Sequence, residues 1–208
     1  MKVTTFFNFD SKLISSTIQA HATELKTDEN GTNNHWNLIN GTYKGINFPV
    51  NFKQEYGKHL TDILDTGWPS LYLISDRMKE ILEKNHLTGW KVFPINLYDK
   101  KNKEITGYHG FSTTGRCGPI NYKKSTIIEK RLVPTGPIYK YYKGLHIELD
   151  QWDGSDFFIP EKTCAIIITQ KAANVLKKNK ITNIRLKNLA DMEMDILLPV
   201  QRHPRGLN

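Results

Sequence analysis

The sequence predicts an α+β protein with mixed sheets, built on two related strand–helix–strand units. The first observation is an internal repeat, because residues 71–92 match residues 165–186 without a gap after a shift of 94 residues. The second is that each copy opens with a continuous apolar run, typical of a buried strand, and continues with apolar residues at helical spacing. The third is the alternation of apolar and polar residues at 144–149, which predicts a further strand.

Each copy contains the signals that begin and end a short helix. Ser75 and Thr169 are expected to cap the two helices, because a hydroxyl oxygen accepts a hydrogen bond from a free N–H of the first turn. Asn85 and Asn179 are expected near the helix ends, where asparagine tolerates the turn out of the helix. The expected core-facing stripes are Met78, Ile81 and Leu82 in the first copy, and Ala172, Val175 and Leu176 in the second.

The chain outside the repeat is predicted as shorter elements. Residues 35–48 are interpreted as a β-hairpin around Asn40-Gly41, since this dipeptide suits a type I′ turn. Residues 56–64 carry apolar side chains at helical spacing and are predicted as a short helix. Further expectations are a strand at residues 3–9, a polar segment that permits a helix at 11–26, and strands at 90–97 and 104–113.

Residues 123–142 are basic and interrupted by Pro134 and Pro137, which predicts a linker or a long loop. With this segment as the connection, residues 1–122 hold the hairpin and the first unit, and residues 123–208 hold the second. A single compact domain is also compatible with a chain of 208 residues.

The composition indicates a soluble, cytoplasmic protein without an export signal. Cys117 and Cys164 are too few for a disulfide framework and fit a reducing compartment. The apolar runs are too short to cross a membrane. The formal net charge is +8 and comes mostly from lysine, whereas specific readers of nucleic acid depend on arginine. A solvated lysine-rich exterior is therefore the preferred interpretation.

Catalytic and metal-binding patterns are incomplete in this sequence. Residues 110–117 have the glycine spacing of a phosphate-binding loop, but Arg116 and Cys117 stand where the chemistry needs lysine and a hydroxyl. Tyr108-His109-Gly110 resembles an element of ADP-ribosyltransferases, which also needs a glutamate such as Glu148 or Glu161. The histidines lack zinc-ligand spacing, so we predict neither a metal site nor a cofactor.

Two segments are candidates for contact with a partner. Acidic and aromatic residues gather at 148–158, and aromatics surrounded by charge suit a protein interface. The same pattern suits a turn with its tryptophan folded into the core, which we prefer. The candidate contact residues are Asp150, Trp152, Asp153, Asp156 and Phe157.

The second candidate is a basic surface interleaved with tyrosines. Such a pattern suits single-stranded nucleic acid, because tyrosine rings stack on bases while lysines pair with phosphates. It suits a solvated loop as well, which we prefer. The basic residues are Lys123, Lys124, Lys130, Arg131, Lys140 and Lys143, and the tyrosines are Tyr122, Tyr139, Tyr141 and Tyr142.

The first copy and its surroundings contain a series of short motifs: Asp62-Ile-Leu, Leu71–Ile74, Ser75-Asp76-Arg77, Met78–Asn85, Leu87-Thr88-Gly89, Phe93-Pro94-Ile95, Leu97-Tyr98-Asp99 and Gly107-Tyr108. In this order the motifs resemble a bacterial immunity-protein family of polymorphic toxin systems, formerly a domain of unknown function. The second copy matches the same pattern in a degenerate form, and residues 123–142 depart from it.

The resemblance implies a cytosolic antidote that binds a cognate protein toxin directly, without catalysis, a cofactor or nucleic acid as partner. It carries no catalytic residue to this chain and leaves the oligomeric state open. A basic chain is a poor mimic of nucleic acid as a whole, although the acidic segment 150–156 is available locally. The hypotheses of a nucleic-acid-binding module and of an ADP-ribosyltransferase-like enzyme remain as alternatives.

Overall fold

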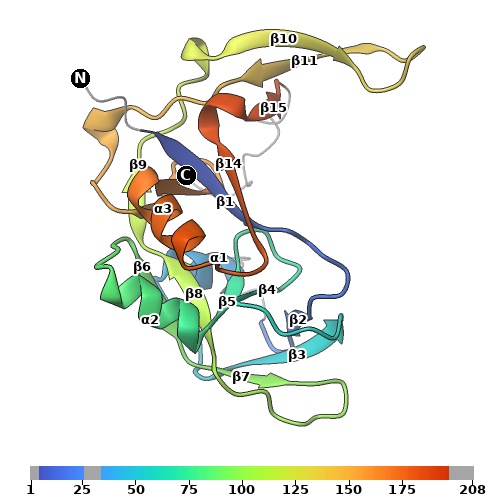
Figure 1. Ribbon diagram of the computed structural model, residues 1–208, viewed down its shortest axis with the longest axis vertical. Helices are drawn as coiled ribbons and strands as arrows, with labels where there is room; N and C mark the ends of the chain where they lie inside the picture. Colours follow the sequence, from blue (N-terminus) through green and yellow to red (C-terminus); the bar gives the residue numbers. More distant parts are fainter. Residues whose placement is uncertain (1–4, 26–33, 197–208) are drawn as a thin grey trace.

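The computed structural model describes residues 5–25 and 34–196, and these residues form mixed α and β structure dominated by strands (Figure 1). The described ranges contain three α-helices and three mixed or antiparallel sheets. The helices are α1 (Asn34–Asn40), α2 (Asp76–Lys84) and α3 (Gln170–Lys178), with 3₁₀ turns η1 (Tyr122–Lys124), η2 (Leu149–Gln151) and η3 (Leu189–Asp191).

Two sheets build the body of the molecule, and a smaller third sheet extends from it (Figure 1). The five-stranded sheet has the order β14 (Ile184–Asn188), β1 (Phe6–Ser11), β13 (Ile166–Thr169), β12 (Phe157–Pro160) and β9 (Gly115–Cys117). The seven-stranded sheet has the order β6 (Trp90–Phe93), β8 (Tyr108–Thr113), β5 (Tyr72–Ser75), β4 (Ile63–Asp65), β2 (Gln19–Ala22), β3 (Val50–Tyr56) and β7 (Ile95–Tyr98). The third contains β10 (Thr126–Arg131), β11 (Ile138–Lys143) and β15 (Glu193–Asp195).

The two large sheets share one pairing pattern. β8 lies between β5 and β6 and pairs antiparallel with both, and β1 lies in the same way between β13 and β14. β4 pairs antiparallel with β5, as β12 does with β13. The first strand of the chain therefore completes a sheet made otherwise of residues 115–188. A boundary between residues 122 and 123 would separate β1 from both of its neighbours.

The helix caps follow the sequence prediction. The Ser75 hydroxyl accepts from the Met78 N–H at 3.1 Å, and the Thr169 hydroxyl accepts from the Ala172 N–H at 3.2 Å. Asn85 and Asn179 stand at the C-terminal caps. The predicted caps are thus confirmed. The predicted stripes are buried at Met78, Leu82, Ala172 and Leu176, and partly buried at Ile81 and Val175.

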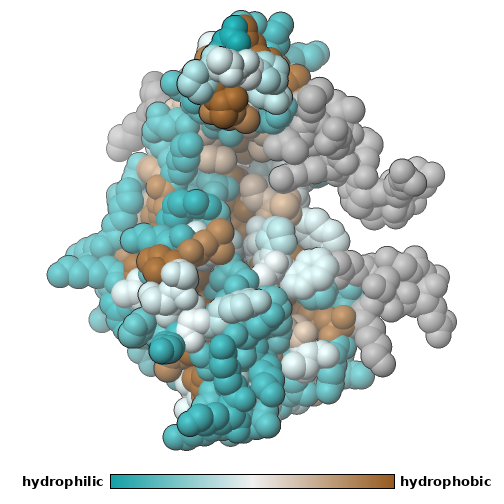
Figure 2. Space-filling model, turned by 90° about the vertical axis from the view of Figure 1, so that its right-hand side faces the viewer, coloured by the Kyte–Doolittle hydropathy of each residue, from teal (hydrophilic) through white to brown (hydrophobic). Residues whose placement is uncertain are grey.

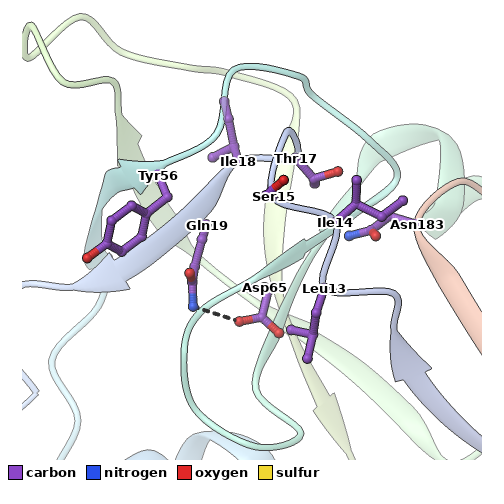
Figure 3. A pocket seen from close by; sticks show the side chains of 9 residues that line it. All are labelled: Leu13, Ile14, Ser15, Thr17, Ile18, Gln19, Tyr56, Asp65 and Asn183. Carbon is purple, nitrogen blue, oxygen red and sulfur yellow. Dashed lines mark hydrogen bonds between the residues drawn. The ribbon is translucent and has the colours of Figure 1, made fainter.

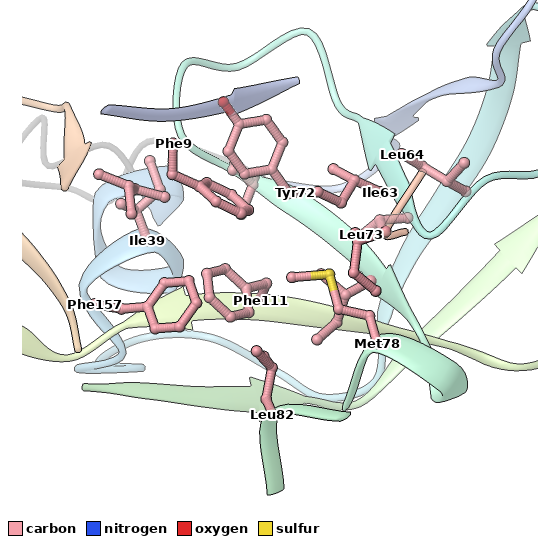
Figure 4. Packing of buried hydrophobic residues seen from close by; sticks show 14 of the residues in the cluster. Phe9, Ile39, Ile63, Leu64, Tyr72, Leu73, Met78, Leu82, Phe111 and Phe157 are labelled. Carbon is pink, nitrogen blue, oxygen red and sulfur yellow. The ribbon is translucent and has the colours of Figure 1, made fainter. Parts of the chain in front are cut away.

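One large hydrophobic core joins the two sheets and the helices. Figure 4 shows Phe9, Phe111 and Phe157 gathered near Met78 and Leu82. Phe157 makes edge-to-face contacts with Phe9 and Phe111, with ring centroids 5.8 and 5.6 Å apart. These three rings come from β1, β8 and β12, so the core depends on strands that are far apart in the sequence.

Two buried carboxylates tie the segment β5–α2–β6 to the segment β13–α3–β14, and we call them the carboxylate clasp. Asp62, just before β4, accepts hydrogen bonds from the Thr182 N–H and hydroxyl, both at 2.8 Å. The same carboxylate accepts from the Ser75 hydroxyl at 2.9 Å and pairs with Arg77 at 2.6 Å. Asp62 thereby joins the capping residue of α2 to the turn that follows α3.

Asp156, just before β12, makes the corresponding contacts in the other direction. It accepts from the Thr88 N–H at 3.1 Å and from the Thr169 hydroxyl at 2.8 Å, and pairs with Lys171 at 3.0 Å. Thr88 lies in the turn after α2, and Thr169 caps α3. The carboxylate that precedes each segment therefore binds the exit turn after the helix of the other segment.

Several sequence predictions are wrong in the described residues. Residues 35–48 are not a hairpin: they contain α1, and Asn40-Gly41 ends this helix with Gly41 at φ +69°. Glycine satisfies the left-handed conformation at a helix end as readily as in a hairpin turn. Residues 56–64 do not form a helix, because β3 ends at Tyr56 and a turn at Gly57 approaches the Thr17 carbonyl too closely for any Cβ.

Four further segments differ from prediction. Residues 123–142 are not a loop, since β10 and β11 pair over them as an antiparallel hairpin. Within 11–26 the described residues contain β2 rather than a helix, while Lys26 lies outside them. The strand predicted at 90–97 is divided at Pro94 into β6 and β7. The strand predicted at 144–149 is not formed, because η2 begins at Leu149 and the preceding residues are irregular.

The clasp predicts a pH-dependent stability. Burial raises the pKa of Asp62, but hydrogen bonds from Thr182 and Ser75 and the Arg77 guanidinium outweigh burial, so the pKa lies below its usual range. A carboxyl with a lowered folded pKa stabilises the fold above its unfolded pKa of about 4, and this contribution is lost as pH falls through the folded value. We expect Asp62→Ala to lower the free energy of unfolding at pH 7 by about 3 kcal/mol.

Urea unfolding at several pH values measures this effect. The variant should lose less stability than the wild type between neutral and acidic pH. Asp150→Ala removes an exposed carboxylate and serves as the matched control. Equal destabilisation by the two variants at pH 7 would contradict the role of the clasp.

Candidate partner-binding surfaces

The acidic segment predicted from the sequence is largely built into the fold. Phe157 is fully buried, and Asp156 is the second clasp carboxylate. The rings of Trp152 and Phe6 meet edge-to-face at 5.2 Å, and the Trp152 indole N–H donates to the Ser155 carbonyl at 3.1 Å. Phe157, Asp156 and Trp152 therefore contribute to packing and hydrogen bonding within the fold. Phe157 has no exposed surface for contact with a partner.

Asp153 organises the turn that follows Trp152. Its carboxylate accepts from the Arg116 N–H at 2.6 Å and from the Ser155 N–H at 3.0 Å. Partial burial raises the pKa of Asp153, but the hydrogen bonds from Ser155 and Arg116 outweigh it and lower the pKa overall. Of the five predicted contact residues, Asp150 and Asp153 are exposed, and Asp153 is already bonded within the turn.

The basic segment forms a hairpin that we call the basic arm, residues 122–143. Figure 1 shows β10 and β11 extending away from the body at one end of the molecule. Its base is held by Tyr122, whose ring lies 4.9 Å from that of Tyr142 and whose hydroxyl donates to the Met194 sulfur. All six predicted basic side chains are exposed: Lys123, Lys124, Lys130, Arg131, Lys140 and Lys143.

The glycine-containing segment 110–117 is not a phosphate loop: it holds the end of β8 and all of β9, two strands that belong to different sheets. A Cβ at Gly110 would lie 2.0 Å from the Phe93 ring, so this glycine allows close packing of β8 against β6. Arg116 donates to the carbonyls of Thr113 and Gly115 at 2.8 and 2.7 Å. Burial raises the pKa of the Cys117 thiol to about 11, so it is protonated at neutral pH.

His109 lies beside the first turn of α2. Its ring nitrogen lies 2.6 Å from the Asp76 carboxylate, in the first turn of α2. Glu148 instead accepts from Asn121 and pairs with Lys124 at 2.8 Å. The contacts described for His109 and Glu148 therefore do not bring them into one site.

Two depressions in the surface were not foreseen from the sequence. Figure 3 shows the smaller one, of about 80 Å³, whose lining includes Leu13, Ile14, Tyr56 and Asp65. Asp65 accepts from the Gln19 amide at 3.1 Å and from the Ser11 hydroxyl at 3.0 Å. The second, of about 380 Å³, lies between α2 and α3 and is lined by Glu80, Ile81, Lys84, Asn85, Val175, Lys178 and Asn179.

Residues 5–25 and 34–196 contain neither a cluster suited to a metal ion nor a helix that could span a membrane. In these ranges the structure brings together no group of three or more His, Cys, Asp or Glu side chains suited to a metal ion. None of the helices it describes there is long and apolar enough to span a membrane.

Comparison with known proteins gives the family of the chain. A family model described as the Imm11 immunity protein family matches residues 8–191. The chain belongs to the Imm11 family. The matched range runs from β1 to η3, so it contains both clasp carboxylates of this Imm11 protein and its entire basic arm. Among curated proteins, none matches the chain. Membership indicates a role in toxin immunity and, in general terms, a toxin as partner.

The structural assignment of Trp152 is testable. Trp152→Ala removes the ring contacts with Phe6 and Phe158. We expect the free energy of unfolding to fall by about 2–3 kcal/mol. This loss is smaller than for a fully buried aromatic side chain, because the Trp152 ring is half-buried. Chemical denaturation measures this loss. Leu149→Ala, at an exposed neighbour, is the control and should change stability by less than about 0.5 kcal/mol. An unchanged stability for Trp152→Ala would show that the ring is a contact residue only.

Proposed function

We propose that this Imm11 protein neutralises a cognate bacterial toxin by stoichiometric binding, without catalysis. The observation that carries the proposal is the family match, which spans residues 8–191. The proposal places the protein in the cytoplasm of a bacterium that carries a polymorphic toxin system. There it protects the cell from the toxin encoded beside it.

The physical character of the molecule supports a binding role. A stoichiometric inhibitor needs a stable scaffold and an exposed complementary surface. The clasp and the common core supply the scaffold, and the arm supplies a surface whose charged and apolar side chains are exposed. In the segment with phosphate-loop spacing, Arg116 donates to the Thr113 carbonyl. His109 likewise contacts the Asp76 carboxylate within the fold.

The acidic turn remains a proposed contact in reduced form. Asp150 and the neighbouring Leu149 are exposed, and Trp152 and Asp153 retain part of their surface. Asp156 and Phe157 support this turn from the interior. In this proposal the turn is a secondary contact, because most of its residues already have structural partners.

We further infer that the two strand–helix–strand segments descend from one duplicated unit. The 94-residue shift superposes not only the helix signals but also the clasp, since Asp62 falls on Asp156 and Thr88 on Thr182. The matching strand registers around β5 and β13 support this origin. Because β1 completes the sheet of the second segment, we propose that the two halves fold together as one unit.

Copurification with the product of the adjacent toxin gene tests the function. Coexpression of the wild-type chain should protect cells from that toxin, and the two proteins should elute together in a one-to-one complex. A clasp variant such as Asp62→Ala, if it fails to fold, should fail to protect and serves as the negative control. Absence of a complex, together with absence of protection, would contradict the proposal.

A further inference from the structure

The basic arm carries an unusual concentration of exposed apolar side chains. Over the described residues 122–143 of the arm, five large apolar side chains are exposed, and all five lie between residues 127 and 139. They are Ile127, Leu132, Val133, Ile138 and Tyr139, with exposed fractions from 37% to 68%. Figure 2 looks toward the tip of the arm, where hydrophobic side chains gather at the upper end of the molecule. Burying side chains of this kind against a partner is favourable, so their exposure points to an interface.

The strand register divides these side chains between two faces. Ile127 is opposite Tyr142, and Ile138 is opposite Arg131. Because side chains alternate along a strand, Ile127, Arg131, Ile138 and Lys140 share one face, which we call the isoleucine face. Toward the body this face ends at Tyr142, which packs against a second, smaller cluster of buried residues that includes Phe6, Leu145 and Phe158. Leu132 and Val133 follow Arg131 directly, in the turn at the tip of the arm.

The opposite face is partly occupied by the protein itself. Lys130 forms an ion pair there with Glu193 of β15. In the pairing of β11 with β15, the same Glu193 is opposite Lys143. On the isoleucine face the acidic side chain is Glu129, 3.7 Å from Lys140. Over residues 122–143 the arm has six basic residues and one acidic residue. The arm therefore has a large positive excess next to apolar side chains.

The outer edge of the arm is open for strand pairing. Within residues 5–25 and 34–196, β10 pairs only with β11, so the backbone groups on its other edge have no strand partner. An exposed edge of this length is a template for an added strand from a partner.

The chemistry of the arm selects among the possible partners. Single-stranded nucleic acid rewards exposed aromatic rings, but Tyr122, Tyr141 and Tyr142 are half-buried and the most exposed side chains are aliphatic. A second copy of the chain would bring two arms of like charge together, which is unfavourable. An acidic protein surface with an apolar depression matches both the charge and the aliphatic side chains.

We propose that the basic arm is the primary docking element for an acidic protein partner, which buries the isoleucine face and extends the arm sheet along β10. This inference rests on the proposed function in naming that partner as the toxin. Leu132 and Val133 at the tip enter the apolar depression, while Arg131 and Lys140 pair with carboxylates at its rim. The body of the protein then serves chiefly to hold the arm.

Binding measurements with two variant pairs test the proposal, using the toxin obtained in the copurification experiment as the probe. Ile127→Asp with Ile138→Asp should weaken binding at least about thirtyfold, because buried apolar anchors dominate such interfaces. The matched control is Leu13→Asp with Leu60→Asp, which changes two exposed leucines of the body. The control should change affinity less than about threefold, and both pairs should retain the wild-type melting temperature.

A second pair separates charge from apolar contact. Arg131→Glu with Lys140→Glu should slow association at least about tenfold at low salt, because electrostatic complementarity acts mainly on the association rate. Lys100→Glu with Lys101→Glu makes the same change of charge in an exposed loop and should have a much smaller effect.

The outcomes separate the proposal from the function on which it rests. If the wild type forms no complex with the toxin, the proposed function fails. If a complex forms but is unaffected by the arm variants, or is weakened by the leucine pair instead, the docking proposal is overturned and the function stands. Tight binding of a single-stranded oligonucleotide at about 150 mM salt, lost in Arg131→Glu with Lys140→Glu, would also overturn it, since the arm would then recognise nucleic acid.

Discussion

The reciprocal carboxylate clasp is the constraint on which the rest of the structure depends. Asp62 and Asp156 each accept a hydrogen bond from the hydroxyl that caps one helix, and each binds the exit turn that follows the other helix. Their burial would be costly without these bonds, so the two segments have to meet in one relative position. That position brings β1 and β8 into their sheets and closes the core around Phe157. The arm is then carried by a body whose two parts are fixed relative to each other.

Local signals in the sequence predict the two capped helices α2 and α3 well, but they predict α1 and the irregular connections poorly. The caps at Ser75 and Thr169 were predictable because an N-cap depends on a hydroxyl next to an apolar stripe, all within a few residues. Asn40-Gly41 misled the prediction because glycine serves a hairpin turn and a helix end equally well. The prolines of the arm predict a loop, but both lie at the tip of the hairpin, between β10 and β11, where they remove no ladder hydrogen bond.

The clasp and the candidate partner-binding surfaces were less predictable than the fold, because their residues are defined by contacts between distant parts of the chain. The internal repeat already placed Asp62 over Asp156, but only the three-dimensional structure brings Thr182 to one and Thr88 to the other. Acidic and aromatic residues at 150–157 look alike in sequence whether they face a partner or the core. Conversely, the exposure of Ile127 and Ile138 follows from the projection of the hairpin, which no local pattern specifies.

The central claim is that this Imm11 protein acts by stoichiometric binding, and a titration of toxin activity tests it most directly. Increasing amounts of the wild-type chain are added to a fixed concentration of active toxin well above the dissociation constant. The account predicts that toxin activity falls linearly, reaches its minimum at one molar equivalent and does not change with longer incubation. Loss of toxin activity at far smaller amounts, progressing with time, would show that the protein acts catalytically and would contradict the account.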